Sequence, residues 1–334
     1  MQTEPYIQPM HAPEAAPILC IVGPTGAGKT HLAMSLAEYA KSIGSTIELI
    51  SMDSALVYRG LDIGSAKPTK AEQVAVIHHL IDILDPTEVY SAARFAKDAK
   101  RLCEEIHSRG NIPVVVGGTM LYWRAWAYGL SSLPPANPEV RARLDEEGKA
   151  LGWPAMHEKL AKVDPETAAR LKPNDSQRVQ RALEVYEITG KPMSALLADA
   201  PSEDGREGST IPPWIKLVSL EPSDRKRLHQ NLEKRFDEML LAGFLDEVKT
   251  LRANPELHAD LPAIRSVGYR QAWEFLNGEI DAEQMRYKAF AATRQLGKRQ
   301  LTWLRAIAGR NTFDPFNPIE LKAALDYCKS NLKK

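Results

Sequence analysis

Gly23-Pro24-Thr25-Gly26-Ala27-Gly28-Lys29-Thr30 is the most informative segment of this sequence for predicting the fold. It matches the Gly-x4-Gly-Lys-Thr pattern of a phosphate-binding loop. The glycines of such a loop allow backbone angles that turn successive N–H groups inward, and the N-terminus of the following helix favours negative charge. In this pattern Lys29 supplies a mobile positive charge and Thr30 a hydroxyl ligand for Mg²⁺. The loop therefore predicts an enzyme that binds a diphosphate or a nucleotide.

The residues on either side place this loop between a strand and a helix. Ile18 to Val22 is an apolar run without alternation, as expected for a strand buried on both faces, and His31 to Lys41 is expected to be helical. Further strands are expected at 46–52, 79–84 and 112–116, and further helices at 92–109 and 120–128. This alternation predicts an α/β fold with a P-loop NTPase-like parallel sheet flanked by helices.

Two polar residues follow strands of this predicted sheet. Asp53 comes after the second strand and Thr119 after the fourth, so both are expected at the carboxyl edge beside the loop. P-loop ATPases commonly have a carboxylate near this position to hold Mg²⁺, but the fourth strand ends in Gly117-Gly118-Thr119. Asp53 is the nearby acid, and the spacing alone is compatible with either a metal ligand or a general base.

The middle of the chain has a different character. A proline-rich break at 133–138 precedes about sixty residues without a strand pattern, and a second break at 200–213 precedes a strand pattern at 215–220. Helices are expected at 225–242, 268–276 and 281–308. These observations predict a core at 15–133 and 214–320, a helical insertion domain at 134–200, and a disordered leader at 1–14.

Composition limits the partners. Lys and Arg together number 43, as do Asp and Glu, so a nucleic acid would have to be met by a local basic patch. The scattered Cys20, Cys103 and Cys328 suit a reducing compartment. No stretch approaches the roughly 20 apolar residues of a membrane span. A cytoplasmic, monomeric protein is expected.

One such patch lies near the C-terminus. Between Gln284 and Asn311 there is no Asp or Glu, and the basic residues are Arg286, Lys288, Arg294, Lys298, Arg299, Arg305 and Arg310. Tyr287, Phe290 and Trp303 are interleaved with them. Cationic and flat side chains together suit an RNA backbone and unstacked bases. The alternative is a solvated helix face whose aromatic residues belong to the core.

A second candidate helix starts at a capping residue, Asp175, and ends at Gly190. Its expected buried stripe is Val179, Leu183 and Tyr186, and its expected exposed face is Gln177, Arg181 and Glu184. Glutamine and arginine one turn apart can contact a base edge or a phosphate, although both are common on any surface.

Taken together, these stretches resemble the tRNA dimethylallyltransferases, also called isopentenyl-tRNA transferases, of bacteria. The matching stretches are 23–30, 53–64, 117–122, 177–184, 264–271 and 294–303, which occur in the order of the family. This chain has Gly26-Ala27 where most members of the family have Ala-Ser in the phosphate loop. After Asp53-Ser54 many members have a Gln, whereas Ala55-Leu56 matches a bacterial subset of the family.

The resemblance implies transfer of a dimethylallyl group from dimethylallyl diphosphate to N6 of the adenosine on the 3′ side of the anticodon in tRNA. It implies catalytic roles for Asp53, Thr119 and Arg141, a diphosphate site formed by 23–30 with Arg225, and Mg²⁺ on Thr30. It places contacts with the tRNA anticodon loop at Asp53, Ser54, Ala55, Leu56, Gln177, Arg178, Val179, Gln180, Arg181, Arg265, Ser266, Val267, Gly268, Tyr269, Arg270, Lys298, Arg299, Trp303 and Arg305.

Three other functions share some of these features. A P-loop kinase of a small metabolite would have the loop and the sheet but no use for an acid-free basic helix. An adenylate isopentenyltransferase would have a similar core without most of the insertion and C-terminal helices. An RNA-binding protein with a structural nucleotide would retain RNA without turnover.

Overall fold

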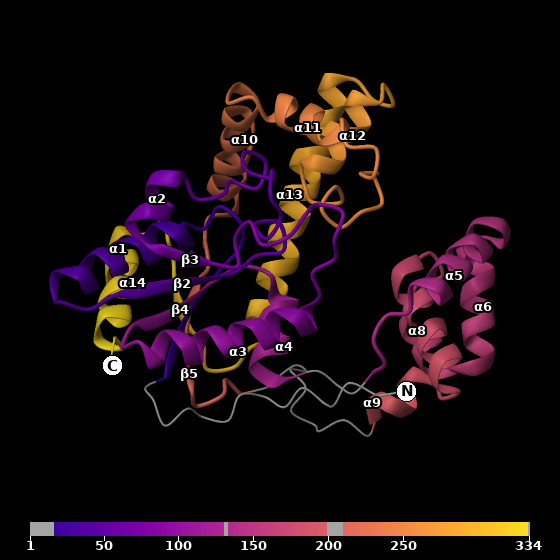
Figure 1. Cartoon of the computed structure of the whole chain (residues 1–334), viewed down its shortest axis with the longest axis horizontal. Helices are drawn as coiled ribbons and strands as arrows, with labels where there is room; N and C mark the ends of the chain where they lie inside the picture. Colours follow the sequence, from indigo (N-terminus) through magenta and orange to yellow (C-terminus); the bar gives the residue numbers. More distant parts are fainter. Residues whose placement is uncertain (1–16, 130–132, 199–209, 333–334) are drawn as a thin grey trace. The chain divides into compact units, whose positions relative to one another are not determined.

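Strand β1 (Ile18–Val22), which leads into the phosphate loop, lies inside a sheet whose strands are all parallel (Figure 1). The structure, a computed structural model, describes residues 17–129, 133–198 and 210–332. Within them the sheet has six strands in the order β3-β2-β4-β1-β5-β6. The others are β2 (Ile47–Met52), β3 (Ile77–His79), β4 (Ile112–Gly117), β5 (Ile215–Leu220) and β6 (Asn311–Phe313). The predicted α/β class with a parallel sheet is confirmed.

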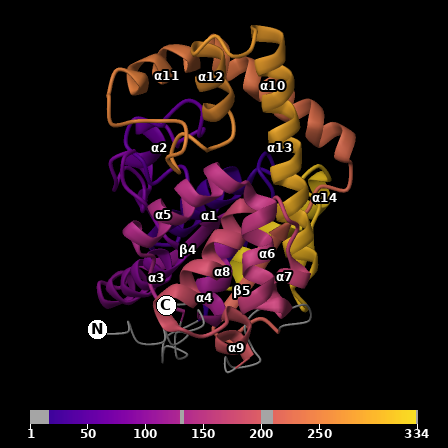
Figure 2. The ribbon, with the colours of Figure 1, turned by 90° about the vertical axis from the view of Figure 1, so that its right-hand side faces the viewer.

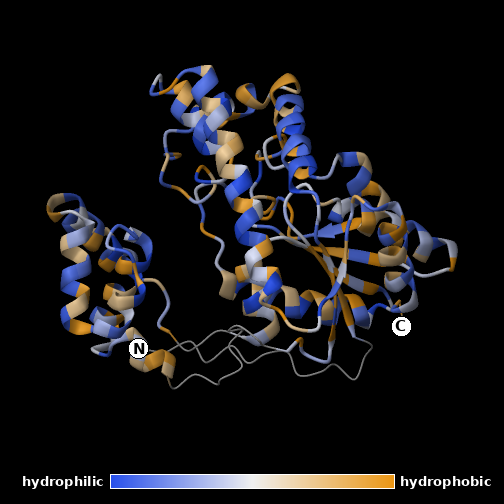
Figure 3. Cartoon of the chain, turned by 180° about the vertical axis from the view of Figure 1, so that it is seen from behind, coloured by the Kyte–Doolittle hydropathy of each residue, from blue (hydrophilic) through white to orange (hydrophobic). Residues whose placement is uncertain are grey.

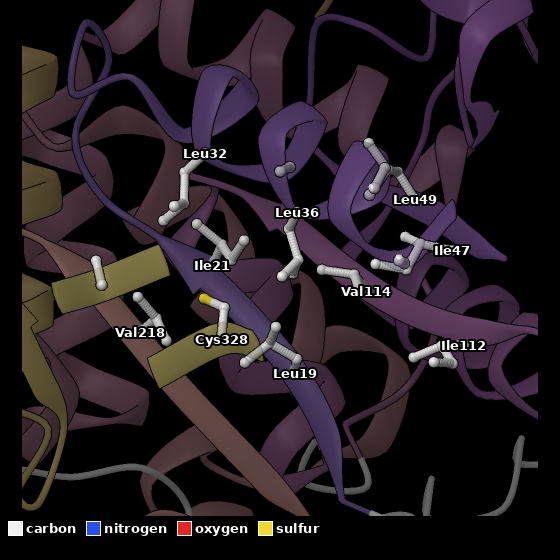
Figure 4. Close-up of a cluster of buried hydrophobic side chains, with 14 of the residues drawn as sticks. Leu19, Ile21, Leu32, Leu36, Ile47, Leu49, Ile112, Val114, Val218 and Cys328 are labelled. Atoms are coloured by element: carbon white, nitrogen blue, oxygen red, sulfur yellow. The ribbon is translucent and has the colours of Figure 1, made fainter. Parts of the chain in front are cut away.

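Both faces of β1 are buried, as the unbroken apolar run predicts. Leu19 and Ile21 pack with residues of α1 (Lys29–Ser42) and α14 (Pro318–Ser330), the layer shown in Figure 4. Cys20, fully buried between them, interacts with Cys103 of α3 (Ala92–Ser108), which belongs to the opposite layer. Figure 3 shows hydrophobic colouring concentrated on the strands and hydrophilic colouring on the outer helices.

The strand order decides which loops meet. β4 pairs with both β1 and β2, so the loops that follow these three strands lie next to one another. The loop after β1 leads into α1, and the turn after β4 leads into α4 (Met120–Tyr128). Parallel strands place all three carboxyl ends at one edge, which is where the phosphate loop, Asp53 and Thr119 are found.

The third strand differs from the prediction. It covers Ile77–His79 rather than 79–84, because Leu80 and Asp82 have left-handed backbone angles, with φ of 62° and 56°. Leu80 and Leu84 are still buried, but from a loop, and the N–H of Asp82 donates to the carbonyl of Leu56 at 3.1 Å. Burial explains the apolar pattern of this segment, while the loop geometry explains why no strand continues through it.

Helices α10 (Arg225–Leu241), α11 (Phe244–Arg252), α12 (Tyr269–Leu276) and α13 (Ala282–Arg305) gather together on one side of the sheet (Figures 1 and 2). Of these helices, α10, α12 and α13 are predicted from the sequence. Helix α11 is not predicted, and neither are α14 and the short helix α2 (Lys70–Ala75). Glu247 of α11 accepts hydrogen bonds from the N–H groups of Asp62, Ile63 and Gly64 at 3.0, 2.7 and 3.3 Å. This single carboxylate joins the helical group to the loop that follows Asp53.

A second unit consists of α5 (Pro138–Leu151), α6 (Trp153–Val163), α7 (Pro165–Arg170), α8 (Ser176–Thr189) and α9 (Met193–Ala198). Its core includes Leu144, Met156 and Leu160. The predicted caps of α8 are confirmed: Asp175 accepts a hydrogen bond from the N–H of Arg178, and Gly190 is left-handed with φ of 69°.

The predicted exposed face of α8 is wrong at Glu184, which is fully buried because two arginines bind its carboxylate. The predicted stripe is also incomplete, since Tyr186 is only half-buried. The predicted leader at 1–14 lies outside the described residues, and the domain bounds 15–133, 134–200 and 214–320 stay predictions. In the described part of the chain, no helix is both long enough and apolar enough to cross a membrane.

Candidate active site

A cavity of about 580 Å³ lies at the carboxyl edge of the sheet and is lined by both sheet and helical residues. Its polar lining includes Thr25, Lys29, Asp53, Thr119, Arg235 and Arg299. Its apolar lining includes Tyr58, Met120, Tyr122, Leu232, Phe236 and Leu296. A cavity with cations beside an apolar wall suits a ligand that has an anionic end and a hydrocarbon end.

The phosphate loop has the geometry that its sequence predicts. Gly28 caps α1 with φ of 79°, which a side chain would disfavour. Lys29 follows it, and its ammonium donates to the carbonyl of Pro24 at 2.8 Å. Burial lowers the pKa of Lys29 to about 8; the positive charge of Arg235 acts in the same direction, whereas Asp53 opposes it. Two cations therefore share this part of the cavity with one carboxylate.

Asp53 and Thr119 come together as predicted. The Oδ1 atom of Asp53 accepts hydrogen bonds from the N–H groups of Ala55 and Leu56 at 2.8 and 3.4 Å. Its Oδ2 atom accepts none from residues that the structure describes. Thr119 Oγ1 accepts from the N–H of Ser54 at 3.1 Å, and its own N–H donates to Met52. Asp53 thus caps its turn with one oxygen and keeps the other available.

Arg235 is the cavity residue that the sequence analysis missed. It lies on α10 between Leu232 and Phe236, on the face of the helix that lines the cavity. Burial lowers its pKa, against the opposing charges of Asp53 and Glu238. An arginine on the apolar stripe of an amphipathic helix is the signal that could have found it. Arg225, the predicted diphosphate residue, is exposed in the first turn of α10 and does not line the cavity.

Arg235→Met is expected to weaken the binding of inorganic pyrophosphate roughly 10- to 100-fold, because a hydrogen bond from a charged donor to the anion is lost. Lys234→Met is the matched control: it removes one positive charge from the next residue, whose side chain is 79% exposed. Calorimetric titration of both variants checks the prediction. Equal losses in the two variants would mean that Arg235 acts only through net charge.

The basic residues of α13 are not equally available. From the start to the middle of the helix, Arg286 pairs with Asp237, Lys288 with Glu274 and Arg294 with Glu233. Arg305, the last residue of the helix, lies 3.9 Å from Glu221, and Arg310, beyond the end of the helix, pairs with the same carboxylate at 2.6 Å. Lys298 and Arg299 have no ion pair within the described residues. The free positive charge of α13 is therefore concentrated beside the cavity, where Arg299 and the 38%-exposed Trp303 lie.

In the segment from Arg265 to Arg270, too, some residues line the cavity and others do not. Arg265 to Tyr269 line the cavity, but Tyr269 is fully buried and its hydroxyl donates to Glu247 at 2.5 Å. Arg270 instead pairs with Glu274. In the Asp53 turn, Ser54 and Ala55 line the cavity, while Leu56, like Thr30, does not.

In the helical unit, the residues predicted to act in catalysis or tRNA binding form hydrogen bonds and ion pairs with one another and with Glu184. Arg141 Nε and Arg181 Nη1 donate to Glu184 at 3.0 and 2.6 Å, and Gln180 donates to the carbonyl of Arg141 at 3.1 Å. Burial raises the pKa of Glu184, but the hydrogen bonds from Arg181, Arg141 and the N–H of Asn137 outweigh it, so that the pKa lies below its usual range. The roles predicted for Arg141 and for Gln177 to Arg181 stay predictions.

The chain is similar to known proteins along most of its length. The family model for IPP transferase matches residues 56–307. A tRNA dimethylallyltransferase of Polynucleobacter necessarius subsp. necessarius is 86% identical over 100% of both chains. One from Paraburkholderia phymatum is 56% identical over 89% of this chain and 92% of its own.

Solved structures agree. The full-length tRNA isopentenylpyrophosphate transferase of Bacillus halodurans is 33% identical, with a TM-score of 0.65 over 95% of this chain and 97% of its own. A eukaryotic dimethylallyltransferase acting on tRNA is 28% identical, with a TM-score of 0.71 over 90% of this chain and 74% of its own. The family model and the full-length relatives cover most or all of the sequence, and the chain therefore belongs to the IPP transferase family.

Proposed function

We propose that this chain transfers the dimethylallyl group of dimethylallyl diphosphate to N6 of the adenosine on the 3′ side of the anticodon in tRNA, releasing pyrophosphate. The observation that carries the proposal is one cavity that brings Lys29, Arg235 and Asp53 together beside an apolar wall. The names of the relatives give dimethylallyl as the transferred group and tRNA as the acceptor for those proteins.

The phosphate loop holds the leaving group in this proposal. As the bond between C1 of the dimethylallyl group and its oxygen breaks, negative charge grows on the diphosphate. Lys29 and Arg235 stabilise that charge, and the N-terminus of α1 adds its dipole. No water needs to be activated in this reaction, because the nucleophile is the adenine amine.

Mg²⁺ belongs to the proposal through Thr30. The described residues contain no group of three His, Cys, Asp or Glu side chains that could hold a metal ion. A hydroxyl in the first turn of α1 fits Mg²⁺ nevertheless, because this ion commonly takes most of its ligands from phosphates and water. When bound, it supplies additional positive charge to the diphosphate oxygens.

Asp53 acts as the general base. The exocyclic amine of adenine is a weak nucleophile, so removing its proton as the new C–N bond forms assists the attack. Asp53 Oδ1 is engaged by Ala55 and Leu56, which leaves Oδ2 to accept that proton. Thr119 holds the turn through Ser54 and lies on the cavity wall.

The apolar wall provides the site for the hydrocarbon part of the substrate. Met120 and Tyr122 come from α4, whereas Leu232 and Phe236 come from α10. Their side chains exclude water from the reacting carbon, which matters because water would compete with the amine as nucleophile.

The tRNA approaches from the side of α13. A stacked adenine cannot reach the cavity, so the base has to be extruded from the anticodon loop. Lys298 and Arg299 offer cations to the phosphate backbone and Trp303 offers a face for stacking. The cytoplasm, where tRNA is found, is the expected location, and a single chain contains the whole cavity.

Labelled dimethylallyl diphosphate, Mg²⁺ and either bulk tRNA or AMP test the proposal when the label is followed. Transfer to tRNA is expected. Transfer to AMP would indicate an adenylate isopentenyltransferase, and tRNA binding without transfer would indicate an RNA-binding protein. No transfer to either acceptor would refute the proposal.

A further inference from the structure

Gln300 of α13, one of the residues that line the cavity, joins two backbone segments. Its Oε1 accepts a hydrogen bond from the N–H of Thr25 in the phosphate loop at 2.9 Å. Its Nε2 donates to the carbonyl of Gly118, in the turn after β4, also at 2.9 Å. The same helix presents Arg299 and Trp303 to the cavity on either side of Gln300 in the sequence.

Glycines lie on both sides of the Gln300 contact. A Cβ atom at Gly118 would lie 2.5 Å from Gln300 Nε2 and 3.0 Å from the carbonyl of Gly23, so a side chain there would displace the Gln300 amide from its present position. One turn before Gln300, the buried Gly297 lies close to the loop, because a Cβ at this position would be 3.9 Å from Pro24. Small residues on both sides allow α13 to approach the phosphate loop closely.

A primary amide is the side-chain group that matches both contacts. It offers an acceptor and a donor at one end, whereas a carboxylate offers acceptors alone and a thioether offers little of either. Both ends of the Gln300 amide are used by the protein backbone. Gln300 therefore lies within the candidate RNA-binding helix with its polar group committed to the phosphate loop.

We propose that Gln300 is a positioning residue that couples the RNA-binding helix to the diphosphate site. It sets the position of Thr25, and with it the phosphate loop, relative to Gly118 and Thr119. The inference rests on the proposed function, since it requires tRNA on α13 and a diphosphate in the loop. Because such coupling is reciprocal, each ligand raises the affinity for the other.

The experiment uses Gln300→Met, which keeps the length of the side chain but removes the amide, and Gln295→Met, an exposed position on the same helix, as the matched control. Dissociation constants for inorganic pyrophosphate with Mg²⁺ are measured with and without saturating tRNA, and the constant for tRNA is measured alone. Thermal unfolding of each variant checks that it is folded.

In the wild type and in Gln295→Met, tRNA is expected to tighten pyrophosphate binding. In Gln300→Met the expected results are about tenfold weaker pyrophosphate binding, loss of the gain caused by tRNA, and unchanged affinity for tRNA alone. A gain that persists in Gln300→Met, or is absent from the wild type, would overturn the inference. So would a loss of tRNA affinity as large as the loss for pyrophosphate, because Gln300 would then be an RNA contact.

Gln300→Glu provides a second variant of the same shape in case Gln300→Met does not fold. It can still accept from Thr25 but cannot donate to Gly118, so it is also expected to lose the gain caused by tRNA. Transfer by the wild type is assayed in parallel. Absent transfer would refute the proposed function, whereas intact transfer with unchanged coupling in the variants would refute this inference alone.

Discussion

Asp53→Asn is expected to abolish dimethylallyl transfer at neutral pH, with a loss in rate on the order of 10²–10⁴-fold, the usual contribution of a positioned general base. Asparagine keeps an acceptor for the N–H groups of Ala55 and Leu56, which Asp53 Oδ1 binds at 2.8 and 3.4 Å. The turn is therefore preserved while the basic carboxylate is removed. Single-turnover transfer of label to tRNA measures the rate.

The affinity of Asp53→Asn for tRNA is expected to stay close to that of the wild type, as measured by filter binding. A large loss of tRNA affinity would instead assign Asp53 to holding the adenine. Asp53→Ala is the less informative variant, because it also removes the cap of the turn that contains Ser54 and Ala55. Asp326→Asn, on α14 with a 56% exposed side chain, is a control in which one carboxylate is lost away from the cavity.

Lys29→Met is expected to reduce pyrophosphate affinity and transfer rate together, by roughly 10²–10³-fold in rate, because the charge acts on the bound diphosphate and on the departing one. Methionine retains an unbranched apolar stem in place of the lysine stem. Titration with pyrophosphate and steady-state transfer measure the two effects. A change in rate with unchanged affinity would show that Lys29 acts only in the transition state.

The pH dependence of binding provides an independent check on Lys29. Its pKa of about 8 means that the free side chain is charged below pH 8 and neutral above it. The affinity of the wild type for pyrophosphate should therefore fall as the pH rises through 8, beyond the change shown by Lys29→Met. Pyrophosphate itself titrates equally in both experiments, so the ratio of the two dissociation constants isolates Lys29. A ratio that does not change with pH would contradict the assigned pKa.

Arg235 is a cavity residue that is not predicted from the sequence. Lys29 could be predicted because its loop has a fixed spacing, but Arg235 comes from a helix about two hundred residues later. Whether Arg235 lines the cavity depends on which face of α10 is turned toward the cavity, and that orientation is set by tertiary packing. The resemblance to the family points instead to Arg225, which is exposed at the start of the same helix. Glu184 was likewise expected on a surface, since the arginines that make its burial possible approach from α5 as well as from its own helix.

Local sequence patterns are sufficient to predict the phosphate loop, the apolar strands, the position of Asp53 and Thr119 after two of them, and the resemblance to a family. These features are encoded by neighbouring residues, because backbone conformation, side-chain alternation and capping act over a few positions. Three features are visible only in the folded chain: β4 lies between β1 and β2, Arg235 lines the same cavity as Lys29, and Gln300 connects α13 to the loop. Those contacts join residues far apart in the chain, so their formation depends on strand order and helix packing rather than on local sequence.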